Sequence, residues 1–271
     1  MADDIEQLLE RADRVLEEGS EGEIEALLGQ LRGALNKASE STLVELYYAL
    51  AGGLVVLGDH RGALEQYGVL RGLPGDDPEL DYWEAVSLFH VWRFDESREK
   101  LRRVRPTEET EAGVSYYDGL LWEFAGEFDR AERSFVRAAE LDPTCYHRPH
   151  RLPVARVEAL LDELVQRMPS AVRAALGNVQ ISVASLPEKA VHDQADVDPL
   201  VLGLYTGVSL LERDSFGGSE LPERVEVFQR NVERVSRDDV QLRHELEITL
   251  KHEVGHHLGW DEDDLADRGL A

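Results

Sequence analysis

Hydrophobic residues recur every three or four positions along the first half of the chain, which is the spacing that places them on one face of a helix. In the stretch Asp4–Glu17 the apolar residues are Ile5, Leu8, Leu9, Ala12, Val15 and Leu16. The stretch Glu23–Asn36 has the same character. We therefore expect two amphipathic helices, which form a hairpin at the start of a longer helical array.

A repeat follows this hairpin. Three segments, which start at Gly58, Trp92 and Gly126, align with one another and begin 34 residues apart. Small residues share one aligned position (Ala63, Ser97 and Ala131), and large residues share another (Tyr67, Leu101 and Phe135). Small residues let two helices approach closely, and the large ones fill the space between them. The pattern predicts helical hairpins with a turn at each of the three starts.

The 34-residue period is that of the tetratricopeptide helix-turn-helix unit. The third unit resembles this pattern best, with Gly119, Gly126, Phe128, Ala131, Phe135, Ala138 and Pro143 at the matching positions. The second unit departs from it, because Trp92 replaces the turn glycine, and Asp77-Pro78 predicts the start of its first helix. Such arrays commonly hold a peptide or protein partner, and the alternatives are a spacer or a dimerisation surface.

The helical period stops between Leu141 and Val154, a stretch with three prolines and two histidines, His147 and His150. We place a domain boundary here, with one domain at residues 1–146 and a second at 154–271. We interpret the two histidines as linker residues.

Mixed elements are expected after the boundary. Apolar periodicity predicts a helix over 154–168 and a short helix after it, and alternation predicts strands over 178–184 and 225–229. A strand or hairpin is expected within 202–213. A long helix is expected over about 238–258, with a capping acid at its start and an apolar residue at every fourth position from Leu242 to Leu258. The predicted fold class is therefore α + (α+β), a helical-hairpin array followed by a small α+β domain.

Charge and composition restrict the partners. Aspartate and glutamate number 55 against 29 lysines and arginines, for a net charge of -26. So negative a surface repels nucleic acid and anionic membranes, and neither is expected as a partner. No apolar run is long enough to span a bilayer and no signal peptide is evident, and the one cysteine, Cys145, fits a reducing compartment. These features favour the cytoplasm.

The candidate metal-binding and catalytic residues lie near the end of the chain, in KHEVGHHLGWDEDDL from Lys251. His252 and His256 lie four residues apart, so both imidazoles leave one helix face and reach one metal ion. Glu253 follows the first histidine, as in the H-E-x-x-H arrangement, where this glutamate is the general base on a zinc-bound water.

The glycine that follows favours a third ligand. Gly259 can end the helix in the left-handed conformation and turn the chain back towards the metal. Asp261, Glu262, Asp263 and Asp264 are the acids within reach. Glu262 lies ten residues after His252, which is the spacing of the third ligand in H-E-x-x-H-x-x-G-x-x-H enzymes. The alternative is that the acidic run is a solvated tail and the histidines serve the helix dipole.

Residues from about Val154 to Leu270 resemble the small bacterial zincin-like metallopeptidases, also called minimal metalloproteases. Two stretches carry the resemblance: GLYTGVSLLERDSF with the strand PERVEVFQ, and HEVGHHLGWDEDDL. The resemblance implies a zincin-like α+β domain, zinc ligands at His252 and His256, and a catalytic base at Glu253. The aspartate of the family pattern falls on Glu262 here, so we favour Glu262 as third ligand and keep Asp261 as the alternative.

The function expected from these features is that of a zinc metallopeptidase, a hydrolase that cleaves peptide bonds of a peptide or protein substrate through water activated by Glu253. The helical repeats would recruit the substrate or a protein partner. The alternative is a non-enzymatic tetratricopeptide-type adaptor in which Zn²⁺ has only a structural role.

Two further expectations concern the substrate. The strand at 224–229 is expected to offer an exposed edge, on which a substrate backbone adds as a new strand. Tyr205 and His192 are candidates for a second oxyanion donor, although a core tyrosine and a loop histidine are the simpler interpretations. His257 is expected to face away from the metal, because it is rotated about 100° from His256 around the helix.

Overall fold

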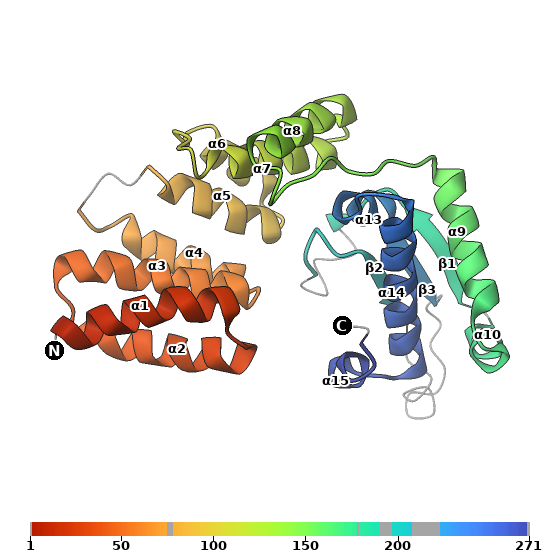
Figure 1. Cartoon of the computed structure of the whole chain (residues 1–271), viewed down its shortest axis with the longest axis horizontal. Coiled ribbons are helices and arrows are strands. Elements are labelled where there is room, and N and C mark those ends of the chain that lie inside the picture. Colours follow the sequence, from red (N-terminus) through yellow and green to blue (C-terminus); the bar gives the residue numbers. More distant parts are fainter. Residues whose placement is uncertain (1, 75–77, 178, 190–196, 208–222, 270–271) are drawn as a thin grey trace. The chain divides into compact units, whose positions relative to one another are not determined.

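A computed structural model describes residues 2–74, 78–177, 179–189, 197–207 and 223–269. The chain divides into two compact units, residues 1–142 and 143–271 (Figure 1). The first is helical, and a three-stranded sheet lies in the second. The predicted domain limits of 1–146 and 154–271 stay a prediction.

The first unit is a succession of helices. It contains α1 (Ala2–Glu18), α2 (Glu21–Ala34), a short 3-10 turn η1 (Leu35–Lys37), α3 (Glu40–Val56), α4 (His60–Leu70), α5 (Leu80–His90), α6 (Phe94–Leu101), α7 (Glu111–Phe124) and α8 (Phe128–Leu141). The helices pack as consecutive pairs, α3 with α4, α5 with α6, and α7 with α8. The helices expected at 4–17 and 23–36 are present as α1 and α2. Helix α5 starts at Leu80, two residues beyond Pro78, and Asp77 lies outside the described residues.

The 34-residue period of the sequence is visible in the backbone. Gly58, Trp92 and Gly126 occupy the turn between the two helices of each pair, and all three have a positive φ, of 75°, 61° and 76°. Trp92 is the one non-glycine residue with this conformation in the described part of the chain. Its side chain is 7% exposed and packs against the rings of Phe94 and Phe124. Tertiary packing therefore holds a tryptophan in a conformation that favours glycine.

The aligned small and large positions form the contact within each pair. Ala63, Ser97 and Ala131 are fully buried, and the Ser97 hydroxyl donates to the Ala85 carbonyl at 2.7 Å. The large residues Tyr67, Leu101 and Phe135 are buried as well. Gly119 faces Phe135 so closely that a β-carbon would lie 2.7 Å from the ring. The third pair therefore depends on glycine at that contact.

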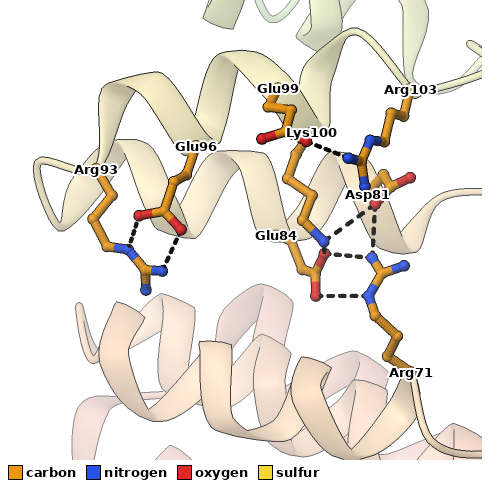
Figure 2. Close-up of polar contacts among 8 residues, drawn as sticks. All are labelled: Arg71, Asp81, Glu84, Arg93, Glu96, Glu99, Lys100 and Arg103. Atoms are coloured by element: carbon orange, nitrogen blue, oxygen red, sulfur yellow. Dashed lines mark hydrogen bonds and ion pairs between the residues drawn. The ribbon is translucent and has the colours of Figure 1, made fainter.

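A charged cluster joins α4, α5 and α6. The Glu84 carboxylate, whose residue is 7% exposed, accepts from Arg71 and Lys100, as Figure 2 shows. Asp81 extends the cluster, because its Oδ1 lies 2.7 Å from Arg71 Nη2 and 3.5 Å from Lys100 Nζ. Two cations thus neutralise a buried acid at the junction of three helices.

The second unit contains α9 (Val154–Arg167), α10 (Ser170–Leu176), β1 (Gln180–Ala184), β2 (Gly203–Thr206), β3 (Arg224–Phe228), α13 (Gln229–Val235), α14 (Asp239–Leu258) and α15 (Glu262–Ala266). The strand order is β1-β3-β2, with β3 parallel to β1 and antiparallel to β2. Helix α14 packs against β2, β3, α9, α10 and α13, so it is the central element of the unit (Figure 1).

The prediction that residues 224–229 form an exposed edge is wrong. Strand β3 is central, because β1 pairs along one side of it and β2 along the other. Val225 and Val227 are fully buried, and Phe228 is 2% exposed. The alternation of apolar and polar residues identified the strand. It does not show which strands pair with it, because that depends on the tertiary fold.

Within the second unit, the segment between α8 and α9 is tied to α13 through one buried acid. Glu233 of α13, which is 2% exposed, accepts from the Arg151 guanidinium at 3.1 Å and from the Leu152 amide at 2.9 Å. His150 Nε2 lies 2.5 Å from Asp239 Oδ1. These contacts give His150 a structural role, in line with the linker interpretation.

Candidate metal centre

Helix α14 carries three of the predicted site residues. Its first turn is capped by Asp238, whose carboxylate accepts from the amides of Val240 and Gln241 at 2.9 Å each. Leu242, Leu246 and Leu250 on its inner face are fully buried, which fixes the rotation of the helix in the unit. That rotation decides where the polar residues of the last two turns point.

The helix ends where the glycine pattern predicts. Gly259 has a φ of 91° and is the left-handed C-cap. Its amide donates to the His256 carbonyl at 3.0 Å, and the Trp260 amide donates to the Gly255 carbonyl at 3.0 Å. The chain is thereby reversed within three residues, so the next segment lies beside the last turn of α14.

The acids after the turn have separate roles. Asp261 is the N-cap of α15, because its side chain accepts from the Asp264 amide at 2.9 Å. Glu262 is the first residue of that helix, and its side chain extends towards the histidines. Its Oε1 lies 3.3 Å from His256 Nε2, and its Oε2 lies 4.0 Å from His252 Nε2.

The small size of Gly255 in α14 lets α15 approach the histidines. A β-carbon on Gly255 would lie 2.5 Å from Cδ2 of Leu265 and 2.8 Å from Cε3 of Trp260. Leu265 is fully buried under α14. The glycine inside the H-E-x-x-H stretch thus lets α15 pack against the helix and bring Glu262 to the histidines.

His252, His256 and Glu262 form a compact group of metal-binding atoms. The two Nε2 atoms lie 2.9 Å apart, and one donor atom from each residue falls within 4.8 Å of the others. His256 Nδ1 lies 3.3 Å from the Trp260 carbonyl, a contact that favours the proton on Nδ1 and a lone pair on Nε2.

This donor set fits a zinc ion. Four ligands at about 2.0–2.1 Å in a tetrahedron lie about 3.3 Å from one another. The separations of 2.9 and 3.3 Å are close to that value, and the 4.0 Å separation involves the Glu262 side chain, which is 73% exposed and has freedom to rotate. Among the described residues, the group offers two imidazoles and one carboxylate, and three protein ligands are typical of catalytic rather than structural zinc sites.

Glu253 lies next to this group, at the contact between α14 and β2. The residue is 6% exposed, and its Oε2 accepts from the Tyr205 amide at 2.6 Å. Burial raises the pKa of its carboxyl to about 7 and the Glu262 charge adds to this rise, while His252 and the Tyr205 amide act in the opposite direction. The hydrogen bond from the Tyr205 amide holds the Glu253 carboxyl in a fixed position against β2.

The close contact of β2 with α14 depends on Gly203. A β-carbon there would lie 2.6 Å from Cγ2 of Thr249 and 3.2 Å from Cγ of Glu253.

The outer side of β2 carries backbone groups that do not pair with β3. The Leu202 carbonyl accepts from the Phe228 amide, so the backbone groups of Gly203 and Tyr205 point away from β3. Among the described residues, no strand pairs with that side of β2.

The remaining sequence candidates are placed as follows. The Tyr205 hydroxyl lies 3.2 Å from His257 Nδ1, and this histidine is fully buried with its Nε2 3.2 Å from the Ala175 carbonyl. His257 thus joins α14 to β2 and α10, away from the group of three donors, and Tyr205 is engaged with it. His192 lies outside the described residues.

Comparisons with known proteins agree with this geometry. Residues 176–270 match the family model described as zincin-like metallopeptidase. The resemblance to zincin-like metallopeptidases that was inferred from the sequence is therefore confirmed over residues 176–270. That family implies a metal, usually zinc, and its members are generally metallopeptidases. The match begins at residue 176, inside the expected limits of about 154 to 270.

No curated protein matches the chain. Among solved structures, the MamA RS-1 ArsTM double mutant is similar at 17% identity and a TM-score of 0.42, over 63% of this chain and 88% of that one. None of the described helices combines the length with the apolar character that a membrane span requires.

Two contributors to the site were missed in the sequence. The Tyr205 amide has no signature, because any residue except proline supplies an N–H. Helix α15 is five residues long, which is too short for a helical period, although Asp261 followed three residues later by Asp264 is a capping signal.

Proposed function

We propose that the second unit is a zinc-dependent metallopeptidase that hydrolyses peptide bonds in a peptide or protein substrate. The observation that carries the proposal is the convergence of His252 Nε2, His256 Nε2 and the Glu262 carboxylate, with the buried carboxyl of Glu253 beside them. Residues His252, His256 and Glu262 would hold the ion. Asp261 is the weaker third-ligand candidate, because its carboxylate is engaged as the cap of α15.

When bound, zinc would supply a Lewis acid that polarises the scissile carbonyl and lowers the pKa of water. Glu253 takes the proton from the attacking water at Oε1, while the Tyr205 amide holds Oε2. As the carbon–nitrogen bond breaks, the same carboxyl delivers that proton to the leaving amine. The His256 ring is oriented by its contact with the Trp260 carbonyl.

The outer side of β2 is the proposed contact for the substrate backbone. Gly203 and Tyr205 direct their backbone groups to that side, next to Glu253, which the central strand β3 does not do. An extended peptide that pairs there would lie beside Glu253. This assignment replaces the edge expected at 224–229.

We further propose that helices α3 to α8 form a tetratricopeptide-like array that recruits the substrate or a protein partner. The support is the regular recurrence of the positive-φ turn at Gly58, Trp92 and Gly126, together with the buried small position at Ala63, Ser97 and Ala131. Pairs of helices that repeat in this way stack into extended arrays.

The peptidase proposal is tested with purified full-length protein, zinc-loaded, on a mixed peptide library read by mass spectrometry. Wild type is expected to produce new termini, and Glu253→Gln is expected to retain zinc and lose cleavage by at least about a thousandfold. Glu245→Gln, on the same helix two turns earlier, is the matched control and should cleave as wild type does. Equal cleavage by wild type and Glu253→Gln would refute the assigned role of Glu253.

A chelation experiment separates this proposal from the adaptor with structural zinc. A catalytic site loses activity on chelation while the far-ultraviolet circular dichroism of the protein is largely kept. A structural site loses the fold of the unit with its metal. Loss on chelation of the part of the helical signal that belongs to the second unit would therefore favour the adaptor.

A further inference from the structure

The second unit contains a cavity of about 460 Å³ between α9, α10, α14 and the turn before α15. Apolar side chains make up most of its walls: Leu164, Met168, Val172, Leu250, Val254 and Leu258. Trp260 closes one side, and Arg268 lies over its ring at 4.4 Å from the centroid. A space of this size is in the range of about 300–1,000 Å³ that small-molecule sites occupy.

The cavity is separate from the candidate metal centre. Its α14 walls, Leu250, Val254 and Leu258, recur every four residues along one face of the helix. His252 and His256 are offset from that series by two positions, which is about 200° around the helix. The cavity therefore lies on the opposite face of α14 from the histidines, and a substrate at the metal does not fill it.

Its polar lining is cationic, which contrasts with the net charge of -26 on the chain. Arg167, Lys251 and Arg268 line the cavity with one acid, Glu247. Lys251 pairs with Glu247 at 2.7 Å, and Arg268 lies 3.2 Å from Asp264. Arg167, the exposed last residue of α9, has no acidic partner within the described part of the chain.

We propose that this cavity binds a small carboxylic acid with an apolar chain. The leucine, valine, methionine and tryptophan walls accept the chain, because burying apolar surface is favourable by about 25 cal/mol per Å². The exposed Arg167 guanidinium donates two parallel hydrogen bonds to the carboxylate. An uncharged apolar ligand would leave this arginine unused, and a cationic one would lie beside the like charge of Arg167.

The test is isothermal titration of the full-length protein with sodium octanoate. The expected result is saturable binding of one octanoate per chain. Arg167→Gln should weaken it at least about tenfold, since a charge-assisted hydrogen bond is stronger than a neutral one by a margin of this order. Arg156→Gln, an exposed arginine three turns earlier on α9, is the matched control and should bind as wild type does.

Two further measurements test whether the apolar walls of the cavity bind the ligand chain. Val172→Trp places a large ring on a half-buried wall of the cavity and should abolish octanoate binding while the thermal unfolding midpoint stays close to that of wild type. 1-Octanol should bind more weakly than octanoate, with an affinity that Arg167→Gln leaves unchanged. The proposal is overturned if octanoate binding does not saturate, or if neither Arg167→Gln nor Val172→Trp weakens it. This inference is independent of peptidase activity.

Discussion

Gly255 of α14 and Leu265 of α15 are in direct contact, with no room for a β-carbon between them. Gly255→Ala would push α15 outward, because the added carbon would lie 2.5 Å from Leu265 Cδ2. Glu262 moves with that helix, so we expect the zinc affinity to fall about tenfold, as it does when residues that support metal ligands are changed. Competitive titration with a zinc indicator measures this loss.

The control for that substitution is Gly29→Ala in α2, where a β-carbon meets nothing within 4 Å. It should leave zinc binding unchanged and stabilise the protein by about 0.5–1 kcal/mol, because alanine has the higher helix propensity. Unchanged zinc affinity in Gly255→Ala would show that the contact between the two helices does not position Glu262.

The two acids after the helix turn should respond differently to loss of charge. Glu262→Gln is expected to weaken zinc binding at least about a hundredfold, since changes in residues that merely support ligands already cost about 10–100-fold. Asp261→Asn should bind zinc within about threefold of wild type, because asparagine is as good an N-cap as aspartate. The same indicator titration distinguishes them, and the reverse order would make Asp261 the ligand.

Tyr67 should make the first unit sensitive to alkali. Its burial raises the pKa of the phenol from 10.0 to about 12 and Glu84 adds to this, whereas the hydrogen bond with Ser87 lowers it. The folded state therefore keeps the proton that the unfolded state releases. The resulting stabilisation is fully present below pH 10 and is lost as the pH rises from 10 to 12, by at most about 2–3 kcal/mol.

Urea unfolding of wild type and Tyr67→Phe at pH 9 and pH 11 measures this effect. The free energy of unfolding of wild type should fall more between the two pH values than that of Tyr67→Phe. Tyr47→Phe, at a half-buried tyrosine of α3, serves as control and should follow wild type. Equal pH dependence in all three proteins would contradict the assignment to Tyr67.

Two carboxylates in Figure 2 provide a matched test of burial. Glu84→Gln leaves Arg71 and Lys100 without their buried partner and should destabilise the first unit by about 1–3 kcal/mol. This is below the value for a fully buried pair, because Arg71 is 45% exposed. Glu96→Gln breaks an exposed pair with Arg93 and should cost about 0.5 kcal/mol or less. Thermal unfolding in low salt compares the two variants. Equal losses of stability would show that the buried contacts of Glu84 stabilise the first unit no more than the exposed pair of Glu96 and Arg93 does.

The sequence predicted the helical pairs well, because a helix buries one face and this leaves a period of three to four residues. It also located the turns at Gly58, Trp92 and Gly126. It did not predict that Trp92 adopts the glycine conformation, since that depends on rings contributed by Phe94 and Phe124. Local preference was overridden there by packing between helices.

In the second unit, the sequence predicted that the two histidines and the acid ten residues after the first come together, because their spacing is local and the helix geometry is fixed. It did not predict the sheet order. Alternation marked β3 as a strand, but its position between β1 and β2 results from contacts with residues more than 15 positions away. The hydrogen bond from the Tyr205 amide to Glu253 also depends on the pairing of β2 with β3.

Metal content per chain tests most directly whether His252, His256 and Glu262 hold one zinc ion. Mass spectrometry of zinc in purified, dialysed protein should give about one ion per wild-type chain and close to none in His256→Ala. His244→Ala, which removes an exposed histidine from the same helix, should retain about one ion. Wild-type protein without zinc, or His256→Ala with a full equivalent, would contradict the account.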